Sequence, residues 1–193
     1  ADAQARGVSQ ALANGQLLGL EPSPGVISAN GGQAEFAKPI WAYLDATITK
    51  EPIAEGQRKL AEWADTLESI ERRFGVDRFT LVAFWGVESG YGKVLDDAAI
   101  VRPVVQSLAT LACGDPRRAG YWRNELLEVL RILAQGDVPL ERLTGSWAGA
   151  MGHSQWMPEV WLNMGIDYNK DGKINPFQVE DGLGGTAAYI AKR

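Results

Sequence analysis

Residues 145–158 read Gly-Ser-Trp-Ala-Gly-Ala-Met-Gly-His-Ser-Gln-Trp-Met-Pro, which is the most unusual stretch of this sequence. Its three glycines let the backbone approach a ligand closely or adopt positive φ angles. Ser146 and Gln155 supply hydrogen-bonding groups, and the two tryptophans supply flat apolar faces. Such a mixture suits a sugar ring, whose hydroxyls are equatorial and whose axial C–H bonds form an apolar face. The same composition fits a tight contact between helices equally well.

A glutamate precedes this block, in the segment Glu88-Ser89-Gly90-Tyr91-Gly92. Glu88 follows an apolar run at the end of an expected helix, so desolvation and the helix dipole should both raise its pKa. A carboxyl that stays protonated near neutrality needs a rise of roughly 2 to 3 units. It could then protonate a glycosidic oxygen. Taken alone, the segment favours a helix-end glutamate that simply reaches water.

The spacing of apolar residues predicts a mainly helical protein. Helical intervals run from about residue 55 to Phe74, and Gly75 supplies a stop signal. Asp77 can cap a second helix, whose almost wholly apolar run should be central to the core. Further helices are expected over residues 119–134 and 179–192. The first 50 residues are rich in turns, and we expect an irregular or partly helical segment, residues 1–54, packing on a core of residues 55–193.

The bulk composition is that of an ordinary globular protein. The 193 residues are 46% hydrophobic and carry a net charge of −5, which gives no general attraction to nucleic acid or anionic membranes. No apolar run is long enough for a transmembrane span. Cys113 is the only cysteine, so no intrachain disulfide exists. A buried free thiol is favoured over a catalytic pair with His153, the only histidine.

Taken together, the segment 88–92 and the block 145–158 resemble the membrane-bound lytic murein transglycosylase B family. The resemblance runs from about Val26 to the end of the chain. The stretches Pro116-Arg117-Arg118-Ala119 and Gln33-Ala34-Glu35-Phe36 also fit it. The long block is highly specific, whereas the short Glu-Ser-x-Tyr-Gly element is weak by itself. The resemblance implies a lysozyme-like catalytic core with one catalytic glutamate, Glu88.

The resemblance also implies a reaction. Family members cleave the β-1,4 bond between N-acetylmuramic acid and N-acetylglucosamine in peptidoglycan without water. Glu88 would protonate the leaving oxygen and then, as a base, assist attack by the muramic C6 hydroxyl on C1, which gives a 1,6-anhydro product. Most glycosidases need a second carboxylate, but an intramolecular hydroxyl removes that need through proximity. We therefore expect Asp96 and Asp97 to be solvated loop residues.

Several substrate contacts follow from the same resemblance. Ser146 and Gln155 match family positions in the sugar cleft, near the acetamido group and the catalytic carboxyl. The remaining implied walls and subsite contacts are Ser89, Trp156, Met157 and Tyr189. Trp156 replaces a more usual phenylalanine. His153 stands where the family often has glutamine or tyrosine, and we expect a cleft-wall or surface residue rather than a second base.

The segment Asp167-Tyr168-Asn169-Lys170-Asp171-Gly172-Lys173-Ile174-Asn175 reads like the first nine positions of an EF-hand loop. Position 12, normally a glutamate, is Gln178, which by itself favours a simple Asx-rich turn. The resembling family uses a longer loop, whose last ligand falls on Asp181. We therefore predict a structural calcium site and no cofactor for catalysis. The predicted ligands are Asp167, Asn169, Asp171, the Lys173 carbonyl and Asp181.

Two other functions stay open: a water-using muramidase of the lysozyme type and a non-catalytic peptidoglycan-binding protein. The resemblance further implies a monomer that acts on glycan strands in the periplasm or outer envelope of a Gram-negative bacterium. Any signal or lipid anchor would lie outside this chain. Family members usually continue past Arg193 with another part of the cleft wall, so a shortened cleft and reduced activity are expected here.

Overall fold

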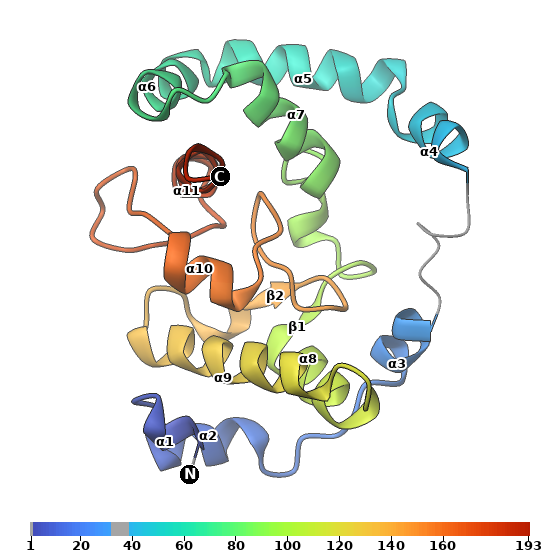
Figure 1. Ribbon diagram of the computed structural model, residues 1–193, viewed down its shortest axis with the longest axis vertical. Helices are drawn as coiled ribbons and strands as arrows, with labels where there is room; N and C mark the ends of the chain where they lie inside the picture. Colours follow the sequence, from blue (N-terminus) through green and yellow to red (C-terminus); the bar gives the residue numbers. More distant parts are fainter. Residues whose placement is uncertain (1, 32–38) are drawn as a thin grey trace. The chain divides into compact units, whose positions relative to one another are not determined.

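The computed structural model describes residues 2–31 and 39–193, and these are mostly helical (Figure 1). The predicted fold class is thereby confirmed at the level of secondary structure. The α-helices are α1 (Asp2–Ala5), α2 (Gln10–Leu17), α3 (Pro24–Gly31), α4 (Ile40–Thr47), α5 (Lys50–Glu62), α6 (Ala64–Phe74), α7 (Arg78–Ser89), α8 (Val104–Gly114), α9 (Ala119–Gln135), α10 (Pro158–Met164) and α11 (Val179–Ala191). The 3-10 helices are η2 (Lys93–Asp96) and η3 (Leu140–Arg142), and the strands are β1 (Arg102–Pro103) and β2 (Thr144–Gly145).

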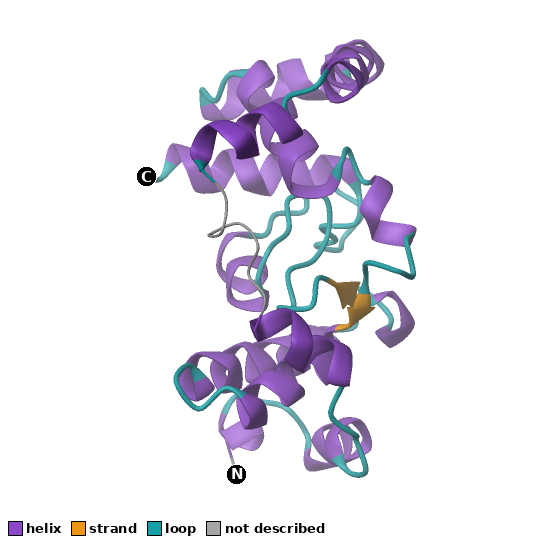
Figure 2. Ribbon diagram, turned by 90° about the vertical axis from the view of Figure 1, so that its right-hand side faces the viewer, coloured by secondary structure: helices purple, strands orange, loops and turns teal. Residues whose placement is uncertain are grey.

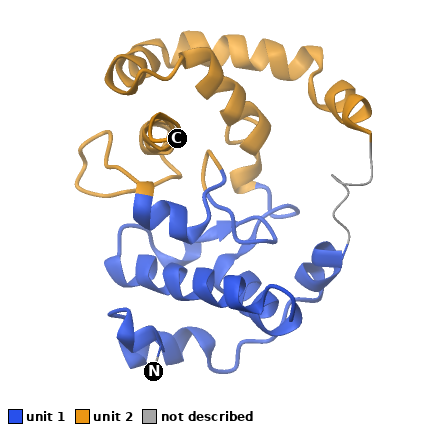
Figure 3. Ribbon diagram, viewed as in Figure 1, with its two compact units in different colours: residues 1–31, 97–151, 155–163 blue, residues 32–96, 152–154, 164–193 orange. Residues whose placement is uncertain are grey.

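The chain folds into two compact units (Figure 3). Unit 1 comprises residues 1–31, 97–151 and 155–163, and unit 2 comprises residues 32–96, 152–154 and 164–193. The expected division at residue 54 separates consecutive stretches of sequence rather than compact bodies, and it stays a prediction. The family-like stretch Gln33–Phe36 lies outside the described residues.

Unit 1 is built on the packing of α8 against α9. Helix α3 packs on α8, while α1 and α2 pack on α9, so the described N-terminal residues are largely helical. A small cluster of Val8, Ala13 and Leu130 joins these helices to α9. Strands β1 and β2, orange in Figure 2, are antiparallel. Arg102 pairs with Gly145. This pairing fixes the start of the glycine-rich block.

Unit 2 is a cluster of α5, α6, α7 and α11 around one apolar core. Its buried members are Leu67, Ile70, Val76, Leu81, Val82, Trp85, Leu183 and Ala187. The single helix expected over residues 55–74 is two helices, which meet at Trp63. Gly75 ends α6 with φ 69°, and the Asp77 carboxylate accepts from Thr80 N at 2.8 Å to cap α7. Both of these boundaries confirm the sequence prediction.

Helix α7 has two different faces. Leu81, Val82 and Trp85 are buried in the core of unit 2, whereas Phe84 and Val87 are 44% and 60% exposed. The helix is therefore central to the core of unit 2, as predicted, but through one face only, because an apolar run cannot reveal which of its sides lacks a neighbour. Glu88 lies on the exposed side, next to Val87.

The structure also bears on the expected burial of Cys113 and on membrane-spanning helices. Cys113 is exposed, not buried, because it lies in the last turn of α8, where it lines a surface cavity with Leu17 and Leu20. None of the helices in the described ranges is both long and apolar enough to span a membrane.

Candidate active site

The carboxyl of Glu88 stands in the last turn of α7 and is accessible to solvent. Within residues 2–31 and 39–193, no hydrogen bond or ion pair holds it. The surrounding protein still desolvates the carboxyl, and this burial raises its pKa above the ordinary glutamate value. An accessible, unpaired carboxyl with a raised pKa keeps its proton to higher pH, so it is suited to donating a proton.

A tight turn follows Glu88 directly. Gly90, Tyr91 and Gly92 have successive φ angles of 57°, 62° and 88°, a run of left-handed conformations that glycine adopts without strain. Gly90 N donates to the carbonyl of Gly86 at 3.0 Å, which closes the helix. The turn therefore stops α7 one residue beyond the glutamate and keeps the carboxyl at the helix end.

Tyr91 fastens this turn to the rest of unit 2. Its ring lies edge-on to Trp85 with centroids 5.8 Å apart, and its hydroxyl donates to the carbonyl of Pro52 at 2.9 Å. The ring fits a slot that glycines leave open, because a Cβ on Gly56 or Gly86 would come within 2.6 Å of the tyrosine. The Glu-Ser-x-Tyr-Gly element is thus a packed unit, and its spacing has a steric cause.

Ser89 is fully buried behind Glu88. Its hydroxyl donates to the carbonyl of His153 at 2.7 Å and accepts from Gly92 N at 3.1 Å. A direct contact with a sugar would require that burial to change. In the structure, Ser89 holds the turn that carries the acid.

His153 is buried, with 8% of its surface exposed, so a surface position was wrong, and a place in the cleft wall stays a prediction. Its Nδ1 accepts a hydrogen bond from Trp85 Nε1 at 2.9 Å. Burial lowers the pKa of the imidazole to about 4, which leaves it uncharged at neutral pH. The sequence could not show this, because a lone polar residue among glycines carries no burial signal.

The first half of the glycine-rich block, in unit 1, is closed by its own hydrogen bonds. Ser146 N donates to the carbonyl of Ala150 at 2.8 Å, and Ala150 N donates to the Ser146 hydroxyl at 3.1 Å. A Cβ on Gly145 would lie 2.2 Å from the Ala150 carbonyl oxygen. Glycine is therefore required here for a tight turn, whatever the turn binds.

The second half of the block presents the remaining predicted contacts. Met151 and Trp156 exchange backbone hydrogen bonds of 2.8 and 2.7 Å, which pins the segment between them. Gln155 has φ 50°, unusual for a residue with a side chain, and is partly exposed. Trp156 is buried and Met157 is half-buried. Gln155 and Met157 thus retain accessible surface, whereas Trp156 mainly supports them.

Glu125 of α9 is a buried carboxyl that the sequence analysis missed. Its Oε2 accepts from Glu159 N at 3.0 Å, in the first turn of α10, directly after the glycine-rich block. Burial raises its pKa. The signal was present in the sequence, since Glu125 stands three residues after Trp122 and four before Val129 on the apolar face of a predicted helix.

The predicted site residues are divided between the units. Unit 2 contains Glu88, Ser89 and Tyr189, and unit 1 contains Ser146, Gln155, Trp156 and Met157. Tyr189 is half-buried on α11, and its hydroxyl accepts from Arg193 at 2.7 Å. Asp96 and Asp97 are exposed, as expected for solvated residues.

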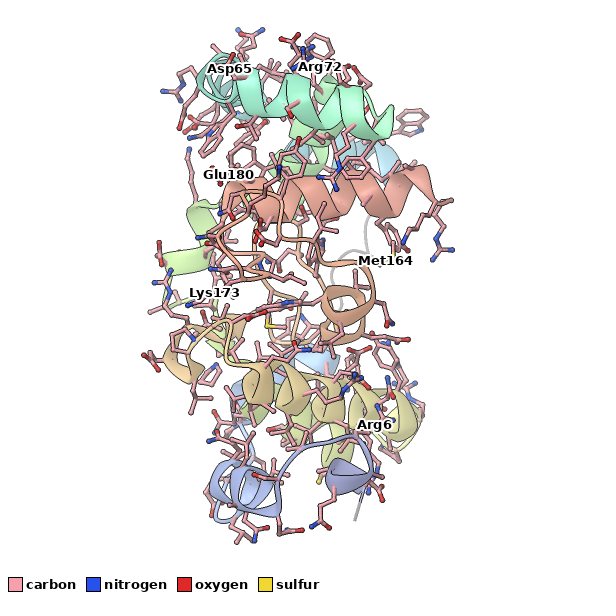
Figure 4. All side chains as sticks on the ribbon, turned by 90° about the vertical axis from the view of Figure 1, so that its left-hand side faces the viewer. Arg6, Asp65, Arg72, Met164, Lys173 and Glu180 are labelled. Atoms are coloured by element: carbon pink, nitrogen blue, oxygen red, sulfur yellow. The ribbon has the colours of Figure 1, made fainter. Side chains whose placement is uncertain are left out.

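The EF-hand-like loop lies between α10 and α11, with Lys173 in the loop and Glu180 in the first turn of α11 (Figure 4). The two carboxylate oxygens of Asp167 accept from Asp171 N at 3.0 Å and from Gly172 N at 2.9 Å. Gly172 has φ 87°, as the sixth position of such a loop requires. The first half of the loop is therefore wound in the expected way.

The second half of the loop fits a cation less directly. Asp181 is fully buried, and its carboxylate accepts from the backbone of Tyr168, Asn169 and Asn175. Gln178 donates to Asp171 at 3.1 Å, a contact that a glutamate at this position could not make. In the described part of the chain, no three His, Cys, Asp or Glu side chains converge as a metal site. Calcium binding by the predicted ligands stays a prediction.

Comparison with known proteins gives concordant findings. The profile of the transglycosylase SLT domain matches residues 1–193. The membrane-bound lytic murein transglycosylase B of Escherichia coli (strain K12) is 34% identical over 150 residues, which cover 77% of this chain and 40% of that protein. SltB3 from Pseudomonas aeruginosa, solved in complex with NAG-NAM-pentapeptide, has a TM-score of 0.90 and 36% identity, over 99% of this chain and 50% of its own.

Escherichia coli Slt35, solved in complex with calcium, has a TM-score of 0.86 and 26% identity, over 98% of this chain and 59% of its own. These likenesses confirm the predicted lysozyme-like fold class. The chain spans about half the length of the proteins it matches.

Proposed function

Because the chain belongs to the transglycosylase SLT domain family, as its sequence motifs predicted, we propose that it is a peptidoglycan lytic transglycosylase. The single observation that carries the proposal is the reachable, unpaired carboxyl of Glu88, whose pKa burial raises. SltB3 has been solved with NAG-NAM-pentapeptide and with NAG-anhNAM-pentapeptide. Peptidoglycan glycan strands are therefore the proposed substrate.

The proposed mechanism uses Glu88 twice. As an acid, its carboxyl gives a proton to the glycosidic oxygen, and the bond from that oxygen to C1 of the muramic residue breaks. As a carboxylate, it then takes the proton of the C6 hydroxyl while that oxygen bonds to C1, which closes the 1,6-anhydro ring. Glu88 ends protonated, so the cycle balances without water and without a cofactor. The intramolecular hydroxyl replaces the second carboxylate of most glycosidases.

The proposed substrate contacts complement this acid. Gln155 and Met157 have accessible surface in unit 1, and the Ser146 hydroxyl can still donate a proton while it accepts from Ala150. Tyr189 offers a half-buried ring and hydroxyl in unit 2. Trp156 and Ser89 are both buried, so we propose that they hold the neighbouring contact residues in place and do not touch the sugar.

Digestion of purified sacculi tests the function directly. The wild-type chain should release muropeptides whose mass is about 18 Da below that of the hydrolysed species, the mass of one water molecule. Glu88→Gln should release them on the order of a hundredfold to ten-thousandfold more slowly, while Glu68→Gln, a change of a glutamate on α6, should behave as wild type. Reducing ends in place of anhydro products would identify a muramidase. If Glu88→Gln digested the sacculi as fast as the wild type, the assignment of Glu88 as the catalytic acid would be overturned.

We also propose that the loop 167–181 binds calcium for stability. Asp167, Asn169 and Asp171 supply the first ligands, and the Lys173 carbonyl and Asp181 complete the set. Support comes from the wound first half of the loop and from the likeness to Slt35, which was solved with calcium. The ion would fix the chain before α11. Calorimetry should show binding heat and a higher Tm with calcium, both lost in Asp167→Asn; no heat with the wild type would refute this site.

The proposed location is the periplasm or the outer envelope of a Gram-negative bacterium, and the proposed state is a monomer. The E. coli relative is named as a membrane-bound murein enzyme, which supports the cell envelope. Light scattering on the purified chain would measure the oligomeric state, and a dimer mass would contradict the second proposal.

A further inference from the structure

The imidazole of His153 makes two side-chain hydrogen bonds of opposite kind. Nδ1 accepts from Trp85 Nε1 at 2.9 Å, and the two rings meet edge to face at 85° with centroids 5.4 Å apart. The backbone of Phe177 forms the other bond, which favours the protonated imidazole. Because a carbonyl acceptor favours that form and Nδ1 already accepts from Trp85, we assign Nε2–H as the donor to the Phe177 carbonyl. The histidine is therefore a neutral Nε2–H tautomer with both nitrogens used.

The main chain of His153 joins the same two parts of unit 2. His153 N donates to the carbonyl of Pro176 at 2.9 Å, and the His153 carbonyl accepts from the Ser89 hydroxyl at 2.7 Å. The residue is thus tied twice to α7, through Trp85 and Ser89, and twice to the segment Pro176–Phe177. That segment lies within the loop 167–181.

Three glycines allow the backbone to pack closely around His153 and Pro176. A Cβ on Gly92 would lie 2.6 Å from the imidazole Cε1, and a Cβ on Gly152 would lie 2.4 Å from the Pro176 carbonyl oxygen. Gly182 of α11 brings its Cβ position within 3.2 Å of His153 Cβ. A side chain at Gly92 would therefore collide with the imidazole, one at Gly152 would collide with Pro176, and one at Gly182 would crowd the His153 Cβ.

The two anchors on α7 stand on either side of the acid. Trp85 lies three residues before Glu88, almost one helical turn, and Ser89 comes directly after it. A shift of His153 would therefore move the last turn of α7, and with it the Glu88 carboxyl. Because proton transfer depends on geometry, a displacement of about 1 Å can cost on the order of a hundredfold in rate.

We propose that His153 is the positioning residue of Glu88, fastening the last turn of α7 to Pro176–Phe177 so that the loop 167–181 fixes the direction of the acid. The inference rests on the proposed role of Glu88. A second base is excluded by the geometry, because both ring nitrogens are occupied and the side chain is buried. A purely structural histidine would affect stability and leave the acid unchanged.

Three variants separate these roles. His153→Leu removes both side-chain hydrogen bonds, whereas His153→Gln keeps one donor and one acceptor. Ile70→Ala, in the core of unit 2 on α6 and outside these hydrogen bonds, is the control for lost stability. For each variant we would measure Tm, kcat and KM on soluble glycan strands, and the Glu88 pKa by carbon-13 NMR with assignment from Glu88→Gln.

The expected pattern is specific. His153→Leu should lower kcat by about tenfold to a hundredfold with KM nearly unchanged, and should move the Glu88 pKa toward the ordinary value. His153→Gln should recover most of kcat, and Ile70→Ala should lower Tm alone. If His153→Leu matches Ile70→Ala in kcat and in the Glu88 pKa, the proposal fails. If the wild type has no activity, the proposed function fails, and the NMR titration still decides whether His153 positions Glu88.

Discussion

Glu88 in unit 2 and Glu125 in unit 1 both have a raised pKa, yet only one of them is suited to catalysis. Burial raises the pKa of both Glu88 and Glu125. Glu125 is 1% exposed in α9, and its oxygen accepts from Glu159 N at the start of α10. Glu88 is accessible at the end of α7 and has no such partner in the described chain.

The two carboxyls differ in their access to solvent and in whether a hydrogen-bond partner already holds them. A carboxyl that already caps a helix cannot approach a substrate, and its charge state serves the fold. An accessible carboxyl without a partner has no structural role to account for its raised pKa, so it can take part in proton transfer. Perturbation alone would have selected both residues; the hydrogen-bond partner separates them.

A matched pair of substitutions tests this difference between Glu88 and Glu125. Glu88→Gln should lower the rate of anhydro-product release on the order of a hundredfold to ten-thousandfold, because the transferable proton is lost. Glu125→Gln should stay within about threefold of wild type, since glutamine still accepts from Glu159 N. Product release from soluble glycan strands measures both. Comparable losses in the two variants would mean that Glu125 also acts in the site.

His153, which supports Glu88, should show the opposite pH dependence to either acid. Its pKa falls from 6.5 in the unfolded chain to about 4 in the fold. Its stabilising contribution is fully present above pH 6.5 and is lost as the pH falls toward 4, about 3 kcal/mol in total. Urea unfolding at pH 7 and pH 4.5 should show a smaller acid loss for His153→Gln than for wild type. Equal losses would contradict a buried neutral imidazole.

The sequence predicted the elements that short-range signals determine. Gly75 and Asp77 marked the boundary between α6 and α7, and the helix expected over residues 119–134 is α9, which ends at Gly136. The break at Trp63 was missed, because the apolar spacing continues across it. Helix α8 was also missed.

Burial was harder to predict than helix boundaries. Phe84 and Val87 looked like core residues, and Cys113 looked like a buried thiol, yet all three are exposed. His153 showed the reverse error. Which side of a helix meets a neighbour depends on tertiary contacts that no local pattern contains. Glu88 was predictable because it belongs to a recognisable motif. Glu125 was overlooked because its place on the apolar face of a helix was the only signal.

The capping role of Glu125 can be isolated from its charge. Glu125→Gln and Glu125→Leu both remove the ionisable group, but only leucine removes the acceptor of Glu159 N. The leucine variant should therefore be less stable than the glutamine variant by about 1 to 2 kcal/mol, from one unsatisfied amide. Chemical unfolding at neutral pH measures the difference. Equal stabilities would show that α10 does not depend on this cap.

The charge of Glu125 should appear as a smaller, pH-dependent effect. Burial first, and then the nearby carboxylates Glu159 and Glu128, raise its pKa above the ordinary 4.5, against the hydrogen bond from Glu159 N. A raised carboxyl pKa means that the folded state holds the proton more tightly, so its contribution is complete below pH 4.5 and declines as the pH rises through the folded value. Unfolding free energies of wild type and Glu125→Gln, measured across that interval, should separate as the pH rises, with the wild type losing stability, because only the wild type carries the cost of ionising a buried group. Curves that stay parallel would mean that Glu125 ionises in the fold as easily as in the unfolded chain, and its resemblance to Glu88 would then end at residue type.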